Sequence, residues 1–222
     1  MNERAEYGVS GTLSIVAANP RTGICGAAVA SKYLAVGKVV PYVRAGVGAF
    51  CTQHWHNPKF GNRALDLLAK GLSCEAVLAA LLKGDKHADK RQLAIVDAAG
   101  RAINRNPPRP DRGGDYWGAA SGKYYACQGN TLTGNAVIFA MAKTYEATRG
   151  SIATRLMAAL LAGDRAGGDH RGRLAAGIIV AKPKVEGHWL ELYVDESKDA
   201  VRELATAFRK LKHPAKSANL RK

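Results

Sequence analysis

Apolar residues near the start of the chain come in short runs separated by residues with turn preference. The runs 12–18 and 24–31 are rich in Val, Ile and Ala, and the residues between them are Asn, Pro, Arg, Thr and Gly. Apolar runs joined in this way predict a β-hairpin. A second pair of runs, 38–43 and 46–52, follows. The pattern predicts four strands, and the many small residues in them indicate close packing of another layer over their sheet.

After Asn57 and Pro58 the spacing of apolar residues changes from about two towards about 3.6 residues. This change predicts two amphipathic helices over 64–68 and 76–81, with Ser73 as the N-cap of the second. The later chain has a hairpin over 92–97 and 101–104, a loop over 106–114 that is a candidate mobile flap, a strand over 123–128, helices over 135–148 and 151–162, strands over 174–181 and 188–194, and a helix over 197–211. Strands and helices occur in blocks, which indicates an α+β fold of four layers with helices outside two stacked sheets.

The length and composition fit one globular domain. The chain has 222 residues, of which 47% are hydrophobic, and no stretch resembles a linker. We expect a single domain over 12–208, preceded by an extension over 1–11 and followed by a basic tail over 209–222. The four widely spaced cysteines predict reduced thiols in the core. The start of the chain lacks an apolar signal segment and no run of about eighteen apolar residues occurs, so a cytoplasmic protein without membrane contact is expected.

The charge of the chain is strongly positive, with a formal net charge of +15. Six of these charges lie in 209–222, which has no acidic residue. Basic residues are not interleaved with aromatic ones as in nucleic-acid modules, so a solvated basic face is favoured over a specific nucleic-acid partner. We expect weak binding at low salt that is largely lost when 209–222 is deleted.

The pair Gly11-Thr12 suggests the clearest chemistry. A threonine hydroxyl becomes a nucleophile when a base lies beside it, and the free α-amino group of the same threonine is one such base. This arrangement requires loss of residues 1–11, by attack of the Thr12 hydroxyl on the Gly11 carbonyl. The alternative is structural, because Gly followed by Thr opens many strands without any chemistry.

Several motifs, in order, resemble one protein family. They are Thr12-Leu-Ser-Ile-Val-Ala, Ala28-Val-Ala-Ser31, Ala35-Val-Gly37, Val40-Pro41, Ala45-Gly-Val-Gly48, Thr52-Gln53, Asn57-Pro58, Arg91-Gln92, Gln128-Gly-Asn130 and Ala166-Gly-Gly-Asp-His-Arg-Gly172. Together they resemble the family called domain of unknown function 1028, from Thr12 to about Leu204. The resemblance implies an N-terminal-nucleophile (Ntn) hydrolase-like αββα sandwich, whereas the family has no agreed reaction. Its members often begin Met-Thr, but eleven residues precede Thr12 here, and Ala175 stands where the family pattern leads us to expect Ser.

Lys38 begins a predicted strand. The pattern around Lys38 resembles that of Ntn-type proteases such as proteasome subunits. In those proteases, a lysine on the corresponding strand lowers the pKa of the nucleophile. The alternative is a solvated lysine, because lysine is rarely buried.

The stretch 52–57 is rich in hydrogen-bonding groups at a predicted strand end. It can supply an oxyanion donor or position a substrate. His54 and His56 are candidate proton carriers, or they anchor the loop. A metal site is not favoured, since no carboxylate adjoins them.

Two further stretches combine glycine with polar side chains. Gln128 and Asn130 end a predicted strand and offer amide donors, or they form a tight turn. In the Gly-rich stretch 167–172, Asp169 can orient a base and Arg171 can bind a carboxylate.

The leading hypothesis is an Ntn-type amidohydrolase or peptidase-like hydrolase that cleaves a small amide or peptide-like bond without a cofactor or metal. The catalytic candidates are Thr12 as nucleophile, Gln53 or Asn130 as oxyanion donor, Lys38 and Asp169. The substrate-binding candidates are Ser31, Thr52, His54, His56, Asn57, Gln128, His170 and Arg171. The alternative is a catalytically silent Ntn-like scaffold that binds a small ligand or a protein partner. Both hypotheses are compatible with a homodimer.

Overall fold

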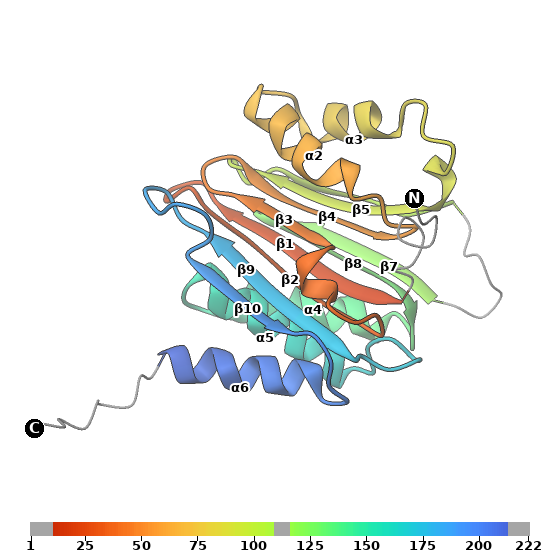
Figure 1. Cartoon of the computed structure of the whole chain (residues 1–222), viewed down its shortest axis with the longest axis vertical. Helices are drawn as coiled ribbons and strands as arrows, with labels where there is room; N and C mark the ends of the chain where they lie inside the picture. The colour runs from red at the N-terminus through yellow and green to blue at the C-terminus, as the bar shows by residue number, and fades with distance from the viewer. Residues whose placement is uncertain (1–10, 109–115, 213–222) are drawn as a thin grey trace, which may run out of the picture.

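The computed structural model describes residues 11–108 and 116–212 and shows a mixed fold of helices and two antiparallel sheets (Figure 1). The larger sheet has six strands in the order β10-β9-β2-β1-β8-β7, and the smaller has four in the order β3-β4-β5-β6. The strands are β1 (Thr12–Asn19), β2 (Ile24–Ser31), β3 (Pro41–Arg44), β4 (Gly48–His54), β5 (Arg91–Asp97), β6 (Ala102–Arg105), β7 (Tyr116–Gly122), β8 (Tyr125–Leu132), β9 (Ala175–Ala181) and β10 (Leu190–Val194). The helices are α2 (Lys59–Ala69), α3 (Cys74–Leu82), α4 (Ala136–Ala147), α5 (Ile152–Arg165) and α6 (Ala200–Lys212), with 3-10 helices η1 (Val36–Lys38) and η2 (Ala88–Lys90).

Three apolar clusters show how the layers pack. Helices α4, α5 and α6 cover one face of the larger sheet around Met141, and helices α2 and α3 cover one face of the smaller sheet around Leu65. The remaining faces of the two sheets meet across small side chains such as Ala27 and Ala49 (Figure 1). Small side chains let two sheets approach closely, as the sequence predicts for these strands. The predicted separation of sheets from helices is confirmed.

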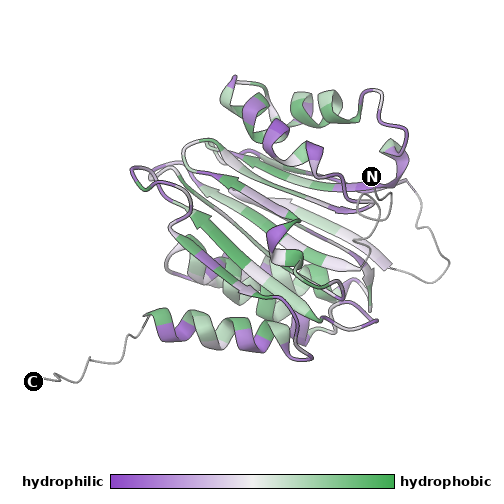
Figure 2. Cartoon of the chain, viewed as in Figure 1, coloured by the Kyte–Doolittle hydropathy of each residue, from purple (hydrophilic) through white to green (hydrophobic). Residues whose placement is uncertain are grey.

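The layer between the sheets is apolar along most of its length and polar at one end. In β1, Val16 and Ala18 belong to the cluster between the sheets, while Leu13 and Ile15 belong to the cluster under the helices. Side chains alternate along a strand, so Thr12 faces the space between the sheets. The same alternation places further buried polar residues there: Ser14, Ser31, Gln53, Gln92, Gln128 and Asn130. Figure 2 shows the hydropathy of the strands and the polar stripes of helices α2 and α6.

The predictions for the N-cap of α3 and for the cysteines are confirmed. Ser73 is the N-cap of α3, and its hydroxyl accepts a hydrogen bond from the Ala76 amide at 3.2 Å. All four cysteines are buried and unpaired. Burial raises the pKa of the Cys51 thiol to about 12, so this thiol is protonated and unreactive at neutral pH.

The prediction that Lys38 begins a strand is wrong. Ala35 has a left-handed backbone with φ of 53°, and Lys38 ends the 3-10 helix η1. Gly37 brings this turn against β9, where a Cβ at Gly37 would lie 2.9 Å from the Cα of Gly177. The strand begins only at Pro41, because the turn uses the preceding residues to reach β9.

Strand β7 was not predicted, and β8 is longer than predicted. The residues of β7 include two glycines, two alanines and a serine, which carry little strand signal, and β7 is an edge strand that pairs only with β8. Its register shifts between Tyr116 and Gly118. Because β8 continues to Leu132, Gln128 and Asn130 lie inside a strand, so the predicted strand end at Gln128 is wrong, and so is the alternative of a tight turn at 128–130.

Some boundaries fall differently from the prediction. Helix α2 begins at Lys59, directly after Pro58, and helix α6 begins at Ala200 and continues through Lys212, so the first four residues of the predicted tail are helical. Most of the predicted flap lies outside the described residues, as do the rest of the tail and residues 1–10. Within the described ranges, every helix is too short or too polar to span a bilayer.

Candidate active site

The Gly11–Thr12 peptide lies at the polar end of the layer between the sheets. Thr12 is fully buried and begins β1, with Ser31 as its partner on β2. The Gly11 amide donates a hydrogen bond to Asn130 Oδ1 at 2.5 Å, and Gly11 has φ of +90°, which favours glycine. The neighbouring strands β2 and β8 thus hold this peptide from both sides.

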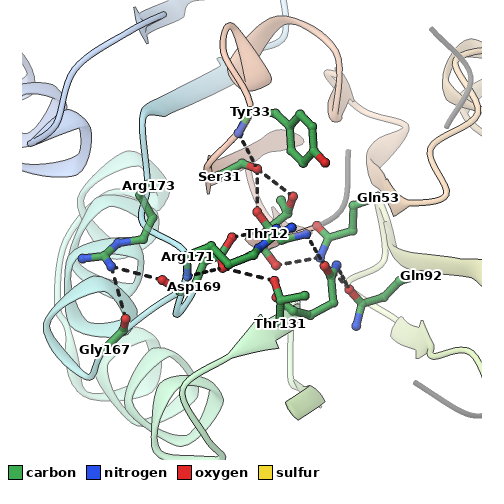
Figure 3. Close-up of polar contacts among 12 residues, drawn as sticks. Thr12, Ser31, Tyr33, Gln53, Gln92, Thr131, Gly167, Asp169, Arg171 and Arg173 are labelled. Atoms are coloured by element: carbon green, nitrogen blue, oxygen red, sulfur yellow. Dashed lines mark hydrogen bonds and ion pairs between the residues drawn. The ribbon is translucent and has the colours of Figure 1, made fainter. Parts of the chain in front are cut away.

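The Ser31 hydroxyl bridges the two residues of this peptide (Figure 3). Thr12 Oγ1 donates to Ser31 Oγ at 3.1 Å, and Ser31 Oγ donates to the Gly11 carbonyl oxygen at 2.5 Å. The backbone amide of Tyr33 donates to Ser31 Oγ at 3.1 Å and holds this hydroxyl in place. The arrangement connects a hydroxyl to the carbonyl of the preceding residue through one proton carrier.

A network of buried amides supports the other side of Thr12. Gln53 Nε2 donates to the Thr12 carbonyl at 3.2 Å and to Gln92 Oε1 at 2.7 Å, and Gln53 Oε1 accepts from Ser14 at 2.6 Å. Asn130 Nδ2 also donates to Gln92 Oε1, at 2.8 Å. The amide groups of Gln53 and Asn130 are therefore engaged with the network, and the donor that reaches the Gly11 carbonyl is Ser31.

Asp169 and Arg171 close the site on the side of Gly11. Asp169 is fully buried and accepts from Thr131 Oγ1 at 3.2 Å, while Arg171 Nη2 donates to Asp169 Oδ2 at 3.1 Å. The guanidinium of Arg171 lies 5.9 Å from the centre of the Tyr33 ring. Arg173 donates to the carbonyls of Gly167 and Asp169 and fixes the Gly-rich loop (Figure 3).

Residues 52–57 form a fixed turn at the end of β4. The Asn57 amide donates to Thr52 Oγ1 at 3.4 Å, and Asn57 Oδ1 accepts from the Lys59 amide at 3.1 Å. The His56 ring is 2.8 Å from the Val39 carbonyl, and burial lowers its pKa. These contacts fit the anchoring alternative for Thr52, His56 and Asn57. His54 ends the strand with φ of 63° and packs 4.4 Å from the Trp117 ring.

An ion pair between Arg91 and Asp85 holds this turn. Arg91 Nε donates to Asp85 Oδ2 at 2.7 Å, their side chains are 3% and 10% exposed, and Arg91 also donates to the Trp55 carbonyl. The Arg91 side chain lowers the pKa of Asp85 by its hydrogen bonds. A carboxyl with a lowered pKa in the folded state stabilises the fold above its unfolded pKa of about 4, and this stabilisation is lost as the pH falls through the folded pKa.

We therefore expect Asp85→Asn to reduce the free energy of unfolding by about 2 kcal/mol at pH 7, because it removes the charge opposite a buried guanidinium. The difference from wild type should begin to shrink as the pH falls below about 4, where Asp85 is protonated in the unfolded chain, and should vanish below its lowered pKa in the folded state. Urea unfolding across this pH range measures it. Asp66→Asn is the matched control, since its pair with Arg44 is exposed and should contribute less than about 1 kcal/mol. Equal effects of the two variants at pH 7 would contradict the expectation.

The structure brings together only part of the predicted set. Thr12, Ser31, Gln53, Asn130, Asp169 and Arg171 meet around the Gly11–Thr12 peptide. Lys38 instead forms an ion pair with Asp195, and its side chain is 50% exposed. His170 is exposed, and Gln128 is fully buried but neither of its amide atoms has a hydrogen-bond partner in the described part of the chain.

Gln92, Thr131 and Tyr33 belong to the site but were not predicted. Gln92 could have been found from alternation, because it lies on the same face of β5 as Ala94 and Val96 and interrupts an otherwise apolar face. Thr131 and Tyr33 have no comparable signal, since their contacts depend on the fold. Ala175 pairs with Ser31 across β2 and β9 and adds no hydroxyl next to it.

A cavity of about 410 Å³ lies at the opposite end of β1. Its lining includes Asn19, Arg21, Tyr124, Lys182 and Trp189 but not Thr12. Residues 11–108 and 116–212 contain no group of three His, Cys, Asp or Glu side chains arranged to hold a metal ion.

Comparison with known proteins gives one family and a number of solved structures, among them the two that follow. The model of a family of unknown function (DUF1028) matches residues 12–204. The crystal structure of protein SPO2555 from Silicibacter pomeroyi, described with the same family model, has a TM-score of 0.81 and 28% identity, and the match covers 91% of this chain and 87% of that one. The ancestral beta-subunit Anbu from Yersinia bercovieri has a TM-score of 0.39 and 10% identity, with 95% of this chain and 100% of that one covered. No curated protein matches the chain.

Proposed function

The chain belongs to the DUF1028 family of unknown function, and from that premise we propose that it is an Ntn-type amidohydrolase in which Thr12 is the nucleophile. The observation that carries this proposal is the Ser31 hydroxyl, which joins Thr12 Oγ1 to the carbonyl oxygen of Gly11. Two facing antiparallel sheets with helices on their outer faces support assignment to the Ntn-hydrolase-like αββα class.

The first step is release of residues 1–11 by the chain itself. Thr12 Oγ1 forms a bond to the Gly11 carbonyl carbon, its proton passes to Ser31, and the Ser31 proton passes to the carbonyl oxygen. The C–N bond then breaks, the Thr12 nitrogen takes back that proton, and Gly11 is held as an ester. Breaking the C–N bond has already freed the α-amine of Thr12, and water then hydrolyses the ester, which restores the hydroxyl and releases residues 1–11.

The second step is cleavage of a small amide or peptide-like bond. The freed α-amine accepts the Thr12 hydroxyl proton and delivers it to the leaving nitrogen. The Ser31 hydroxyl donates to the developing oxyanion. Gln53 holds the Thr12 carbonyl and Asn130 Oδ1 faces the acyl side, so both act as positioning residues. No cofactor takes part in this scheme.

The mass of the intact purified protein tests the proposal. We expect a species that lacks residues 1–11 and begins at Thr12, and this species should form with time in purified protein without any added protease. Persistence of the full-length chain, with no turnover of a library of small amides, would instead favour the alternative of a catalytically silent scaffold. That alternative draws support from the complete burial of Thr12 inside an uncleaved chain.

We expect Lys38→Ala to leave the rate of this release within about twofold of wild type. Lys38 lies in an exposed ion pair with Asp195, and such pairs contribute little. Intact-mass time courses of both proteins measure the rate. A loss of more than about tenfold would show that Lys38 acts on Thr12.

A further inference from the structure

Gly11 lies in a corner of the site that has no room for a side chain. A Cβ built on Gly11 would overlap Arg171 Nη2 and Asp169 Oδ2, inside the 3.0 Å that real Cβ atoms keep from their neighbours. The two overlapped groups, Arg171 and Asp169, form an ion pair with each other beside the Gly11–Thr12 peptide. Arg171 and Asp169 therefore form a wall against the α-carbon of residue 11.

Three hydrogen bonds to Asp169 Oδ1, two of them from Arg171, hold this wall. Asp169 Oδ1 accepts from Thr131 Oγ1 on β8, from the Arg171 amide at 2.9 Å and from Arg171 Nε at 3.2 Å. Asp169 is fully buried, so withdrawal of the Arg171 guanidinium would leave this carboxylate without its opposite charge and with hydrogen bonds only from Thr131 Oγ1 and the Arg171 amide. The wall cannot move aside for a methyl group without that cost.

A substrate carbonyl must occupy the place of the Gly11 carbonyl to be attacked. Ser31 Oγ donates to the oxygen in that place, and Thr12 Oγ1 donates to Ser31 Oγ. The α-carbon of a substrate bound there faces the wall. Asn130 Oδ1 accepts a hydrogen bond from the amide N–H of residue 11. A substrate in this place therefore needs an N–H group on its α-carbon.

We propose, on the basis of the proposed function, that the Thr12 site takes N-acylglycyl amides. The acyl residue has no side chain, its N–H donates to Asn130 Oδ1, and Arg171 is the residue that excludes larger acyl residues. Thr12 Oγ1 bonds to the glycyl carbonyl carbon, the amide C–N bond breaks, and the amine leaves with the proton carried by the Thr12 α-amine. Water then releases an N-acylglycine.

The first experiment follows release of residues 1–11 by intact mass in four full-length chains: wild type, Gly11→Ala, Arg171→Ala and the double variant. Gly11→Ala should slow release by about 100-fold, because the clash displaces the reacting carbonyl. The double variant should recover about tenfold over Gly11→Ala, and the remainder reflects the overlap with Asp169 Oδ2 and the left-handed φ of residue 11. Arg21→Ala, an exposed arginine at the far end of β1, is the matched control and should rescue nothing. Release of Gly11→Ala at the wild-type rate overturns the inference.

The second experiment uses the protein after release and compares N-acetylglycyl and N-acetyl-L-alanyl 4-nitroanilides. The ratio of kcat/KM should favour the glycyl compound by about 100-fold in the wild type and by about tenfold or less in Arg171→Ala. Equal hydrolysis of both compounds by the wild type overturns the inference while leaving the proposed function intact.

Failure of the proposed function has a different signature. If the wild type stays full-length, thermal unfolding of variants in the Thr12→Ala background still tests whether Arg171 and Asp169 exclude a side chain at residue 11. This measurement needs no reaction. Gly11→Ala should then lower the Tm, and adding Arg171→Ala should restore part of the loss relative to Arg171→Ala alone. An unchanged Tm in Gly11→Ala would contradict the inference that residue 11 has no room for a side chain.

Discussion

Thr12→Ala is expected to abolish both the release of residues 1–11 and the hydrolysis of amides, by a factor on the order of 10⁴ or more. The variant has no atom that can bond to the Gly11 carbonyl, whereas the surrounding groups are unchanged. Its fold should be retained, because Thr12 makes one side-chain hydrogen bond, to Ser31, and alanine fits the same strand position. Intact mass over several days and a coupled assay for free amine measure the two losses.

Two further variants separate this role from a structural one. Thr12→Ser keeps the hydroxyl and should retain measurable release. Ser31→Ala keeps the nucleophile but removes the donor to the Gly11 carbonyl, and should slow release by about 10²- to 10³-fold. Undiminished release or turnover in Thr12→Ala would exclude Thr12 as the nucleophile and leave the scaffold alternative or another site.

Gln92→Met is expected to destabilise the protein by about 3–4 kcal/mol, the largest loss from a single polar side chain of the site. Gln92 is fully buried and makes four hydrogen bonds, of which Oε1 accepts two from Gln53 and Asn130. Its Nε2 donates to the Gly129 carbonyl at 2.9 Å and to Asn106 at 2.8 Å. Methionine fills a similar volume but removes the acceptor of Asn130 Nδ2 and one of the two acceptors of Gln53 Nε2, both of which are fully buried. The Tm should fall by roughly 6–16 °C in calorimetry.

Gln128→Met is the matched control, because the chemical change and the burial are the same. Neither amide atom of Gln128 has a partner in the part of the chain that the structure describes, so the substitution removes no hydrogen bond. We expect a stability within about 1 kcal/mol of wild type, or higher, since a buried amide without partners is itself costly. If the two variants lost equal stability, hydrogen bonding within the network would not be the reason for the loss at Gln92.

The polar end of the layer between the sheets was within reach of sequence reasoning. Gln53 and Gln92 lie two residues from Cys51 and Ala94, on faces that are otherwise apolar, and strand alternation alone places them in the interior. The Gly11-Thr12 pair could likewise be identified from the sequence, because its proposed chemistry depends on two adjacent residues. The predicted strand start at Lys38 is wrong, since a left-handed residue at Ala35 starts a turn that the apolar pattern of 38–43 does not reveal.

The sequence by itself determined the helices, most of the strands and which of their side chains face the interior, because these follow from the spacing of side chains along a local backbone; β7 is the exception. Only the tertiary structure decided which buried polar groups meet. Asn130 reaches the Gly11 amide across 119 residues because β8 pairs with β1, and Ser31 reaches the Gly11 carbonyl because β2 pairs with β1 on the other side. Strand order and register carry no local signal, since they are set by the packing of all layers at once. The wall that Arg171 and Asp169 build against Gly11 is therefore a property of the fold, although each of its residues stood in the chain as a candidate.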